Sequence, residues 1–599
     1  MLRRRLLQGA TAMMAWPMPA LRVPANASPR RSPVRRRRPA DPGWPSAAQW
    51  QQLDKSVGGN LMAVQPMLAP CEVSAVSAAC LAVTNHLRNP FFVGDQVAGT
   101  QVSGWLGAWV PAASAFAIRA TSTADVVAGV NFARDHQLRL VVKGAGHSYQ
   151  GTSNAADSLL IWTRAMNEVT LHDSFVPACC EGRVAPVEAV SAQAGALWID
   201  LYHAVTTVRG RYVQGGGCAD VGVAGLIQSG GFGSFSKGFG SAASSLLEAE
   251  IVTADGQVRT VNACCDPELF WALKGGGGGS WGVVTRVTLR THALPKFFGA
   301  AWGLVKARSD DAYRKLLARF VDFYADALFN PHWGEQLAIS PDNTLKIAMV
   351  CQGVDSRQAE MTWKPFFDWV KASPQDFTIV EEMGSWVGDA RRWWAVEGNQ
   401  SMIPDTRVGA KKHHGWWKGD QDQVGAWLHG YDSLWLPAKL LEASQRPRLV
   451  DALLASSRHK RLDLQFNKGL AGSPAAAIES ARDTATNPVV CEAFALVIIA
   501  DGEGPAYPGF PRSPPDLAAA RQTAANIDLA AAALRQVVPN AGSYVSESNY
   551  FNPNWKREFW GPNAARLEAV KARIDPEGLF FVHHGVGSEA WSADGFDRL

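Results

Sequence analysis

Two segments of the chain combine a flexible backbone with a side chain that can form a covalent bond. The first, Lys143–Ser148 (KGAGHS), directly follows a strand-like stretch and carries His147. Its small residues let backbone N–H groups turn toward an anion and let that anion approach closely. A pyrophosphate is a ligand that suits such a loop. The run differs from the GxGxxG pattern of nicotinamide-binding folds, and a single histidine after such a loop is also compatible with a polar turn.

The second segment is longer and contains a cysteine. Glycines recur throughout Gln214–Gly233 (QGGGCADVGVAGLIQSGGFG), which carries Cys218, and a third segment, Ala272–Val284 (ALKGGGGGSWGVV), holds five consecutive glycines. Glycines this dense let the backbone lie against a flat ligand with no side chain between. A glycine-rich packing loop is the alternative, but such a loop needs no cysteine. Strands and helices flank all three segments, so they are not linkers.

The elements that must position these loops are mixed strands and helices, which favours an α+β fold. Over residues 113–295 we predict strands Leu138–Lys143, Leu159–Thr163, Glu188–Ala192 and Glu250–Ala254, and helices Ser122–His136 and Ala196–Thr207. A second α+β domain is predicted over residues 296–540, with strands Thr344–Val350 and Leu462–Asn467 and a helix Asp516–Val537.

The remaining segments are shorter. Residues 541–592 read as a compact tail with a helix near Asn563–Ile574. Residues 28–48 read as a Pro/Arg-rich linker, and residues 49–112 as an extension of unclear role. The length of 599 residues fits two or three domains, at roughly 100–200 residues per domain.

Charge is unevenly distributed along the chain. Residues 1–40 hold ten arginines and no acidic residue, which leaves 48 basic against 54 acidic residues in the remainder. A slightly acidic body argues against nucleic acid as the main partner. The basic run Arg35–Arg38 is expected to be a solvated spacer, and contact with a membrane surface or with nucleic acid is the alternative.

The N-terminus has the pattern of an export signal. Arg3–Leu7 (RRRLL) matches the twin-arginine motif, an apolar stretch follows, and Ala25–Ala27 (ANA) offers a small-x-small cleavage site. We therefore expect a signal peptide over residues 1–27, the twin-arginine export machinery as a partner, and a periplasmic or secreted protein. A disordered basic tail is the alternative. No later stretch approaches the ~20 apolar residues of a membrane span, so no stable span is expected.

The chain has nine cysteines, which suits disulfides in an exported protein. Because nine is odd, at least one cysteine must have another fate, and the pairing stays open. The spacing lacks the paired CxxC groups of a zinc site. The adjacent His413 and His414 have no further suitably spaced ligands in the sequence, so no metal site is expected.

Taken together, these segments resemble a known family. KGAGHSYQG (Lys143–Gly151) and GGGCADVGVAGLIQSGGFG (Gly215–Gly233) are similar to the two FAD loops of berberine-bridge-enzyme-like oxidases, within the vanillyl-alcohol oxidase superfamily. DPELFWALKGGGGGSWGVVT (Asp266–Thr285) resembles their third signature, and Trp555–Phe580 resembles their C-terminal segment. The resemblance covers most of residues 110–592 and looks closest to members similar to 6-hydroxy-D-nicotine oxidase and isoamyl alcohol oxidase.

This resemblance implies a two-part, PCMH-type FAD-binding domain over residues 113–295 and a substrate domain with an antiparallel sheet over residues 296–540. The tail is implied to return to the FAD-binding domain. FAD is implied to be covalently bound through His147, at the flavin 8α position, and through Cys218, at C6. The other implied cofactor contacts are Lys143, Gly144, Ala145, Gly146, Ser148, Gly151, Gly217, Val221, Gly222, Gly225, Gly230, Gly231, Gly233 and Val283.

The resemblance also places a catalytic base, which relatives supply as a tyrosinate or a carboxylate from the substrate domain or the tail. Tyr544 and Glu547 lie where the family usually has a Tyr-x-Asn motif, but Ser546 replaces the asparagine. Phe466 stands where several relatives have a carboxylate. We expect Tyr544 or Glu547 as the base and Asn467 as a hydrogen-bonding group to substrate. A packed Tyr544 and a solvated Glu547 are the alternative.

These expectations describe an FAD-dependent oxidase. It would take a hydride from a C–H bond of a small alcohol, amine or sugar onto flavin N5 and pass the electrons to O2, giving H2O2. Val221, three residues after the cysteine, is the residue type that admits oxygen in relatives. A flavin dehydrogenase that reduces a quinone or protein carrier is one alternative, and a non-catalytic ligand-binding protein on the same fold is another. The many tryptophans of residues 296–540 are expected mostly to fill the core.

Overall fold

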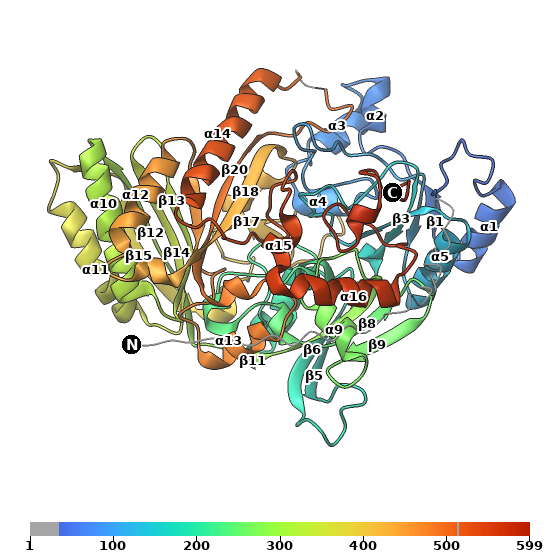
Figure 1. Cartoon of the computed structure of the whole chain (residues 1–599), viewed down its shortest axis with the longest axis horizontal. Coiled ribbons are helices and arrows are strands. Elements are labelled where there is room, and N and C mark those ends of the chain that lie inside the picture. Colours follow the sequence, from blue (N-terminus) through green and yellow to red (C-terminus); the bar gives the residue numbers. More distant parts are fainter. Residues whose placement is uncertain (1–34, 512–513) are drawn as a thin grey trace, which may run out of the picture. The chain divides into compact units, whose positions relative to one another are not determined.

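The computed structural model describes residues 35–511 and 514–599, and the export signal expected over residues 1–27 lies outside this range. Three large sheets organise the described chain (Figure 1). Among the described residues, no helix combines the length and the apolar character needed to cross a lipid bilayer.

Two of the sheets belong to the region predicted as the first α+β domain. One has the strand order β1-β2-β4-β3 and the other β5-β6-β10-β8-β9. Strands β2, β3 and β4 are parallel, and the other pairs are antiparallel. Their bounds are β1 (Leu61–Ala63), β2 (Phe116–Arg119), β3 (Arg139–Lys143), β4 (Ser158–Trp162), β5 (Val169–Phe175), β6 (Val187–Gln193), β8 (Leu246–Val252), β9 (Val258–Asn262) and β10 (Val283–Arg290). All four predicted strands are present, although β8 begins at Leu246 rather than Glu250.

The helices predicted here are also present. Helix α5 (Thr123–Asp135) begins after Ser122, whose side chain and that of Asp125 form a capping box. The second predicted helix is α6 (Trp198–Leu201), which continues as a π-helical segment, Tyr202–Val208. The other helices of this region are α7 (Val223–Gln228), α8 (Ser236–Phe239) and α9 (Pro267–Leu273).

The third sheet has seven strands, and it confirms the predicted α+β organisation with an antiparallel sheet. Its order is β15 (Phe377–Asp389), β12 (Phe297–Ala307), β14 (Thr344–Gln352), β13 (Trp333–Ile339), β19 (Leu462–Gln465), β20 (Ala493–Glu503) and β18 (Trp427–Pro437). Two short two-stranded sheets complete the set: β7 (Arg211–Tyr212) with β11 (His292–Ala293), and β16 (Met402–Pro404) with β17 (Gly415–Trp417).

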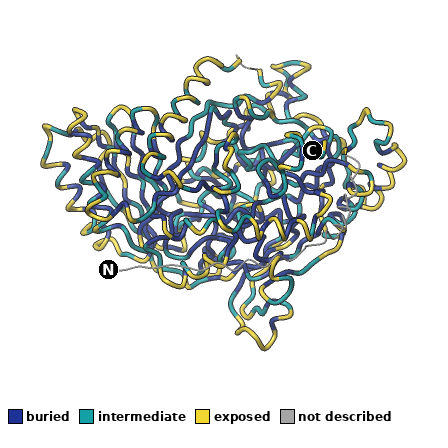
Figure 2. Tube along the Cα trace, in the orientation of Figure 1, coloured by how far each residue is buried: buried dark blue, intermediate teal, exposed yellow. Residues whose placement is uncertain are grey.

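The two faces of the seven-stranded sheet differ because side chains alternate along each strand. On one face Leu337 pairs with Leu464, and both belong to a buried core. Four helices cover this face (Figure 1): α10 (Asp310–Phe323), α11 (Ser356–Lys371), α12 (Arg446–Ser457) and α14 (Leu517–Arg535). In Figure 2 exposed trace lies along the outer sides of these helices, and buried trace runs through the middle of the molecule. On the other face Gln336 pairs with Gln465. That polar face is therefore available to line a site.

The extension over residues 49–112 braces the first glycine loop, a role that the sequence did not indicate. It contains α1 (Ala47–Ser56), α2 (Ala69–Val73), α3 (Ala78–Thr84) and α4 (Pro90–Gly94), and β1 adds an edge strand. The Gln101 backbone N–H donates to the Gly146 carbonyl at 2.9 Å. The buried Lys143 ammonium donates to the carbonyls of Gln96 (3.0 Å) and Gly99 (3.1 Å). These bonds fix the loop from outside the predicted domain.

The tail packs back on the first two sheets. It contains α15 (Trp555–Trp560) and α16 (Ala564–Ile574), which confirms the predicted helix; one further helix, α13 (Ala475–Arg482), precedes β20. The Trp560 indole N–H donates to the Gly275 carbonyl at 3.2 Å. Phe580 forms a bridge with Leu140 beside the first glycine loop.

The prediction that Arg35–Arg38 are a solvated spacer is wrong for Arg36, which is 3% exposed. Its guanidinium donates to the carbonyls of Gly578, Leu579 and Gly595 and lies 3.8 Å from the ring centre of Trp591. A buried guanidinium needs such acceptors, and the turns of the tail supply them. We call residues Arg35–Arg38 the strap, because they tie the start of the described chain to its tail.

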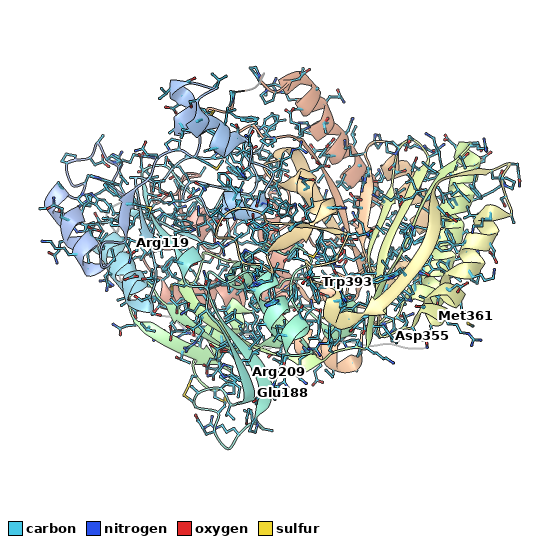
Figure 3. The ribbon with its side chains drawn as sticks, turned by 180° about the vertical axis from the view of Figure 1, so that it is seen from behind. Arg119, Glu188, Arg209, Asp355, Met361 and Trp393 are labelled. Carbon is cyan, nitrogen blue, oxygen red and sulfur yellow. A yellow bond between two sulfur atoms is a disulfide. The ribbon has the colours of Figure 1, made fainter. Side chains whose placement is uncertain are left out.

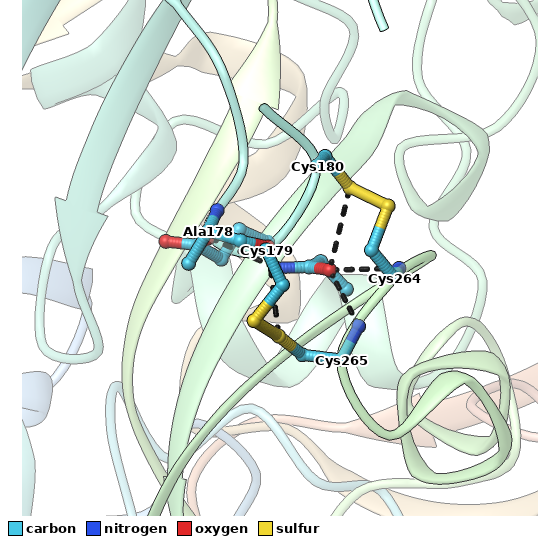
Figure 4. Close-up of a disulfide and its surroundings, with 7 residues drawn as sticks. Ala178, Cys179, Cys180, Cys264 and Cys265 are labelled. Carbon is cyan, nitrogen blue, oxygen red and sulfur yellow. Dashed lines mark hydrogen bonds between the residues drawn. A yellow bond between two sulfur atoms is a disulfide. The ribbon is translucent and has the colours of Figure 1, made fainter. Parts of the chain in front are cut away.

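Three disulfides and three free cysteines account for all nine cysteines. Cys71–Cys80 links α2 to α3, while Cys179–Cys265 and Cys180–Cys264 lie side by side and join the loop after β5 to the turn after β9 (Figure 4). The free cysteines are Cys218, Cys351 and Cys491. The expectation that at least one cysteine has another fate is thus confirmed.

Each adjacent tryptophan pair puts one ring deep in the core, in line with the expectation that tryptophans mostly pack. Trp394 and Trp416 are 3% and 4% exposed, whereas Trp393 and Trp417 are only partly buried. The Trp393 and Trp417 ring centres lie 5.7 Å apart, and Figure 3 shows Trp393 far from Met361 on α11.

Replacing Arg36 with alanine is expected to lower the free energy of unfolding by about 3 kcal/mol, because it strands buried carbonyls without donors. Thermal unfolding followed by circular dichroism measures the effect. Arg35→Ala is the matched control, since the Arg35 side chain is 62% exposed and pairs only with surface carboxylates. Equal melting temperatures for the two variants would show that the strap adds no stability.

Candidate active site

The three glycine segments and the polar face of the seven-stranded sheet line one cavity of about 1020 Å³. Ligand pockets commonly span roughly 300–1,000 Å³, so this cavity has room for a large cofactor together with a small substrate. The tail contributes the stretch Tyr544–Glu547, and β19 and its following turn contribute Gln465 and Asn467. Groups from both predicted domains and the tail therefore meet in a single site.

The glycines at this cavity fit a flat ligand. A Cβ at Gly225 would meet no protein atom within 4 Å, and one at Gly217 would meet its nearest neighbour only at 3.8 Å, so both present bare backbone to the cavity. At Gly233 a Cβ would lie 2.2 Å from the Gly215 carbonyl oxygen. Crowded glycines thus let the loops pack against each other, while open glycines leave backbone exposed to a bound group. This arrangement fits FAD.

Most of the predicted cofactor contacts line the cavity. They are His147, Cys218, Lys143, Gly144, Ala145, Gly146, Ser148, Gly217, Val221, Gly222, Gly225 and Gly233. For Lys143 only the backbone is free, because its ammonium bonds the extension; burial lowers the pKa of this side chain to about 7. Gly277, Gly278 and Gly279, from the third glycine segment, also line the cavity.

Four predicted contacts lie outside the cavity lining: Gly151, Gly230, Gly231 and Val283. Gly151 packs against the Trp109 ring, and the two glycines form a turn against Thr486 and Leu226. Val283 points into the core because it follows Gly282 on a strand, where side chains alternate; Gly282 and Val284 line the cavity instead. The motif located the loops, but not which residue of each loop faces inward.

The imidazole of His147 is held by a buried carboxylate. Its Nε2 lies 2.6 Å from Oδ2 of Asp220, whose side chain is 4% exposed. Asp220 comes from the second glycine segment, so this contact joins the first two loops. No hydrogen-bond partner for Nδ1 occurs among the described residues, so Asp220 makes the two ring nitrogens of His147 chemically distinct.

The three predicted catalytic residues all line the cavity, with different partners. Glu547 forms an ion pair with Lys468. The Tyr544 hydroxyl accepts from the Gly231 backbone N–H at 3.3 Å, and burial, together with the Glu547 charge, raises the pKa of this phenol well above its usual value. The Asn467 amide donates to the Gly233 carbonyl at 3.1 Å, while its Oδ1 is buried with no partner among the described residues.

The charged cavity residues that sequence reasoning missed include Asp220, Glu335, Asp420 and Lys468. Asp220 lay two residues beyond Cys218 in the quoted motif, so its proximity was readable. The other three come from the region predicted as the substrate domain. Glu335 and Asp420 carry no motif, whereas Lys468 directly follows the predicted site residue Asn467. Burial raises the pKa of Glu335, and burial followed by the Asp220 charge raises that of Asp420 to about 7.

The expectation that His413 and His414 lack a third ligand is wrong, because the fold brings Asp200 to them. Asp200 Oδ1 accepts from His413 Nε2 at 2.9 Å, His414 Nε2 at 3.1 Å and Lys411 Nζ at 2.9 Å. Burial acts to raise the pKa of Asp200, but the two imidazoles and the Lys411 charge hold it well below its usual range. Because the Lys411 ammonium contacts the same oxygen as the two imidazoles, the cluster is a charged contact that joins Asp200 to the segment Lys411–His414.

Two family models match the chain. Residues 114–262 match the FAD binding domain, and residues 539–587 match the berberine and berberine-like segment. Among curated proteins, the FAD-linked oxidoreductase ZEB1 of Gibberella zeae is 28% identical over 579 residues, covering 92% of this chain and 93% of that protein.

Solved structures share the fold. The VAO-type flavoprotein MtVAO615 from Myceliophthora thermophila C1 superposes with a TM-score of 0.75 at 24% identity, covering 94% of this chain and 100% of that one. A glucooligosaccharide oxidase from Acremonium strictum, which carries a 6-S-cysteinyl, 8α-N1-histidyl FAD, superposes with a TM-score of 0.60 at 19% identity, covering 81% and 94%.

Domains, relatives and fold agree with the glycine-lined cavity. The chain is an FAD-linked oxidoreductase that contains an FAD binding domain and a berberine-like C-terminal segment, and it is similar to VAO-type flavoproteins over nearly its whole length.

Proposed function

We propose that this chain is an exported FAD-dependent oxidase that carries FAD on both His147 and Cys218. It oxidises a C–H bond of a small alcohol, amine or sugar and passes the electrons to O2. The observation that carries the proposal is that both side chains open into the same glycine-lined cavity. The doubly linked FAD of the similar glucooligosaccharide oxidase supports it. FAD supplies the two-electron acceptor when bound, and the protein supplies orientation and proton transfer.

Glu547 is the side chain best suited to accept the proton of a substrate hydroxyl. Its carboxylate lines the cavity and forms an ion pair with Lys468. Tyr544 is unsuited to that role, because its raised pKa keeps the phenol protonated at neutral pH. It is instead a hydrogen-bond donor, and the free Oδ1 of Asn467 is an acceptor for the substrate.

Export rests on two independent supports. The twin-arginine pattern of Arg3–Leu7 is followed by a cleavage-site shape, and the described chain holds three disulfides. Disulfides persist in oxidising compartments such as the periplasm or the exterior of the cell. A covalent cofactor also suits such a location, because it cannot be lost by dilution.

The purified protein is expected to keep its flavin after acid precipitation, with FAD mass on the tryptic peptides of His147 and Cys218. Cys218→Ala should retain the His147 bond alone, and the double variant H147A/C218A should release free FAD into the supernatant. A yellow supernatant from the wild-type protein would rule out both bonds, and a protein without flavin would overturn the oxidase proposal.

Glu547→Gln is expected to lower kcat/KM by roughly 10²–10⁴-fold, the usual contribution of a general base. Tyr544→Phe should have a smaller effect, because it removes one hydrogen bond worth about 1 kcal/mol. Steady-state assays with peroxide detection measure both, and flavin absorbance confirms cofactor loading. Glu360→Gln, on the exposed outer side of α11, is the matched control. An unchanged kcat/KM for E547Q would exclude Glu547 as the base.

Stopped-flow mixing of the reduced protein with air-saturated buffer tests the electron acceptor. Fast reoxidation is expected, and Val221→Leu should slow it by about tenfold, or about 1.4 kcal/mol in the barrier, by narrowing the approach beside Cys218. Slow reoxidation of the wild-type protein, with rapid reduction of a quinone, would identify a dehydrogenase instead.

A further inference from the structure

A carboxyl group lies directly against the thiol of Cys218. Asp420 comes from a 3-10 turn, Lys418–Gln423, that follows β17, and its side chain interacts with the Cys218 thiol inside the cavity. Its Oδ2 atom is buried and has no hydrogen-bond partner among the described residues. Burying a carboxylate oxygen without a hydrogen-bond partner costs free energy. A functional role for Oδ2 would explain why the folded protein keeps it there.

The start of this turn is held by two hydrogen bonds and by a strand pairing. The Trp417 indole N–H donates to the Gly217 carbonyl at 3.2 Å, which ties the turn to the residue before Cys218. The Lys418 backbone N–H donates to the Ser401 carbonyl at 2.9 Å, and β17 pairs with β16. Asp420 therefore lies two residues after backbone that is hydrogen-bonded and next to a side chain that bonds the Cys218 loop.

Bond formation by Cys218 needs a proton acceptor. The nucleophilic form of cysteine is the thiolate. Here burial, followed by the Asp420 and Asp220 charges, raises the pKa of the Cys218 thiol well above its usual value, so the group is protonated at neutral pH. A base within hydrogen-bond reach must take the proton as the sulfur reacts.

The other carboxylates near this site are already engaged. Asp220 holds His147 at 2.6 Å, Glu335 is hydrogen-bonded to Ser234, and Glu547 is paired with Lys468. Asp420 alone among these four combines contact with the thiol and a free oxygen. Its pKa of about 7 leaves a large share of it ionised at neutral pH and still basic enough to accept a proton.

We propose that Asp420 is the general base that removes the Cys218 thiol proton during attachment of the cofactor, an inference that rests on the proposed Cys218 bond. The S–H bond breaks and its proton passes to Asp420, while a bond forms between Sγ and flavin C6. The C6 hydrogen leaves as a proton, and two electrons remain on the cofactor. Molecular oxygen accepts the two electrons and two protons and becomes H2O2, so the attachment balances.

The test compares the wild-type protein with Asp420→Asn, Asp420→Glu and Asp422→Asn. Asp422 is the matched control: it lies in the same turn and lines the same cavity, but its side chain is 90% exposed and pairs with Arg88. Samples taken through expression in air are alkylated and digested. Mass spectrometry then measures three peptides: His147 with FAD, Cys218 with FAD, and Cys218 alkylated.

In D420N we expect the His147 bond to be complete and the Cys218 bond to form about 100-fold more slowly, within the range of a lost general base. D422N should match the wild-type protein, and D420E should restore most of the rate, because it keeps a carboxylate. The His147 bond reports, in the same sample, that the variant has folded around FAD.

Three outcomes would overturn the inference. If the Cys218 bond forms in D420N at the wild-type rate, Asp420 is not the base, although FAD is still bound through both His147 and Cys218. A wild-type protein with FAD on His147 and alkylated Cys218 would refute the proposed Cys218 bond itself. Loss of both bonds in a D420N protein that melts normally would show that Asp420 serves cofactor binding rather than proton transfer.

Discussion

The site depends on the close approach of backbone segments that are far apart in the chain. Gly233 packs so tightly on Gly215 that a single added carbon would lie 2.2 Å from a carbonyl oxygen, a distance that no side chain tolerates. This packing shapes the second glycine segment so that Cys218 faces the cavity and Asp220 reaches His147. Everything that the cavity does chemically follows from this backbone geometry.

The cavity is also a set of acidic groups held apart by specific partners. Asp220 is occupied by an imidazole, and Glu547 by an ammonium. Each partner offsets the cost of burying a carboxylate, so each acid is confined to one role. The raised pKa of Glu335 and the value of about 7 for Asp420 show what burial and neighbouring charge do where no cation is in contact. The neighbours of each acidic group therefore decide which proton-transfer role we propose for it.

The fold and the cofactor loops could be predicted from the sequence, because they depend on local signals. A hydrophobic run predicts strand β3, and a capping serine predicts the start of helix α5. The dense glycine segments are explained most simply by a flat ligand. The inward-facing residues could not all be predicted. Val283 faces the core rather than the cavity, because its partner strands decide which side chains of a strand point inward. Asp420 was missed because no sequence motif marks a turn that packs against a distant part of the chain.

Arg36 has a consequence for the order in which the protein can be assembled. Its carbonyl acceptors belong to residues 578–595, which leave the ribosome more than five hundred residues after Arg36 itself. The strap therefore cannot dock while the chain is still being made, and closing it is among the last events of folding. A segment that lies close behind the expected leader is thus secured only after the tail of the chain has been made and has reached it. The docked state of Arg36 therefore marks a completed chain, and it does so near the N-terminal end, which would be the end presented for transport.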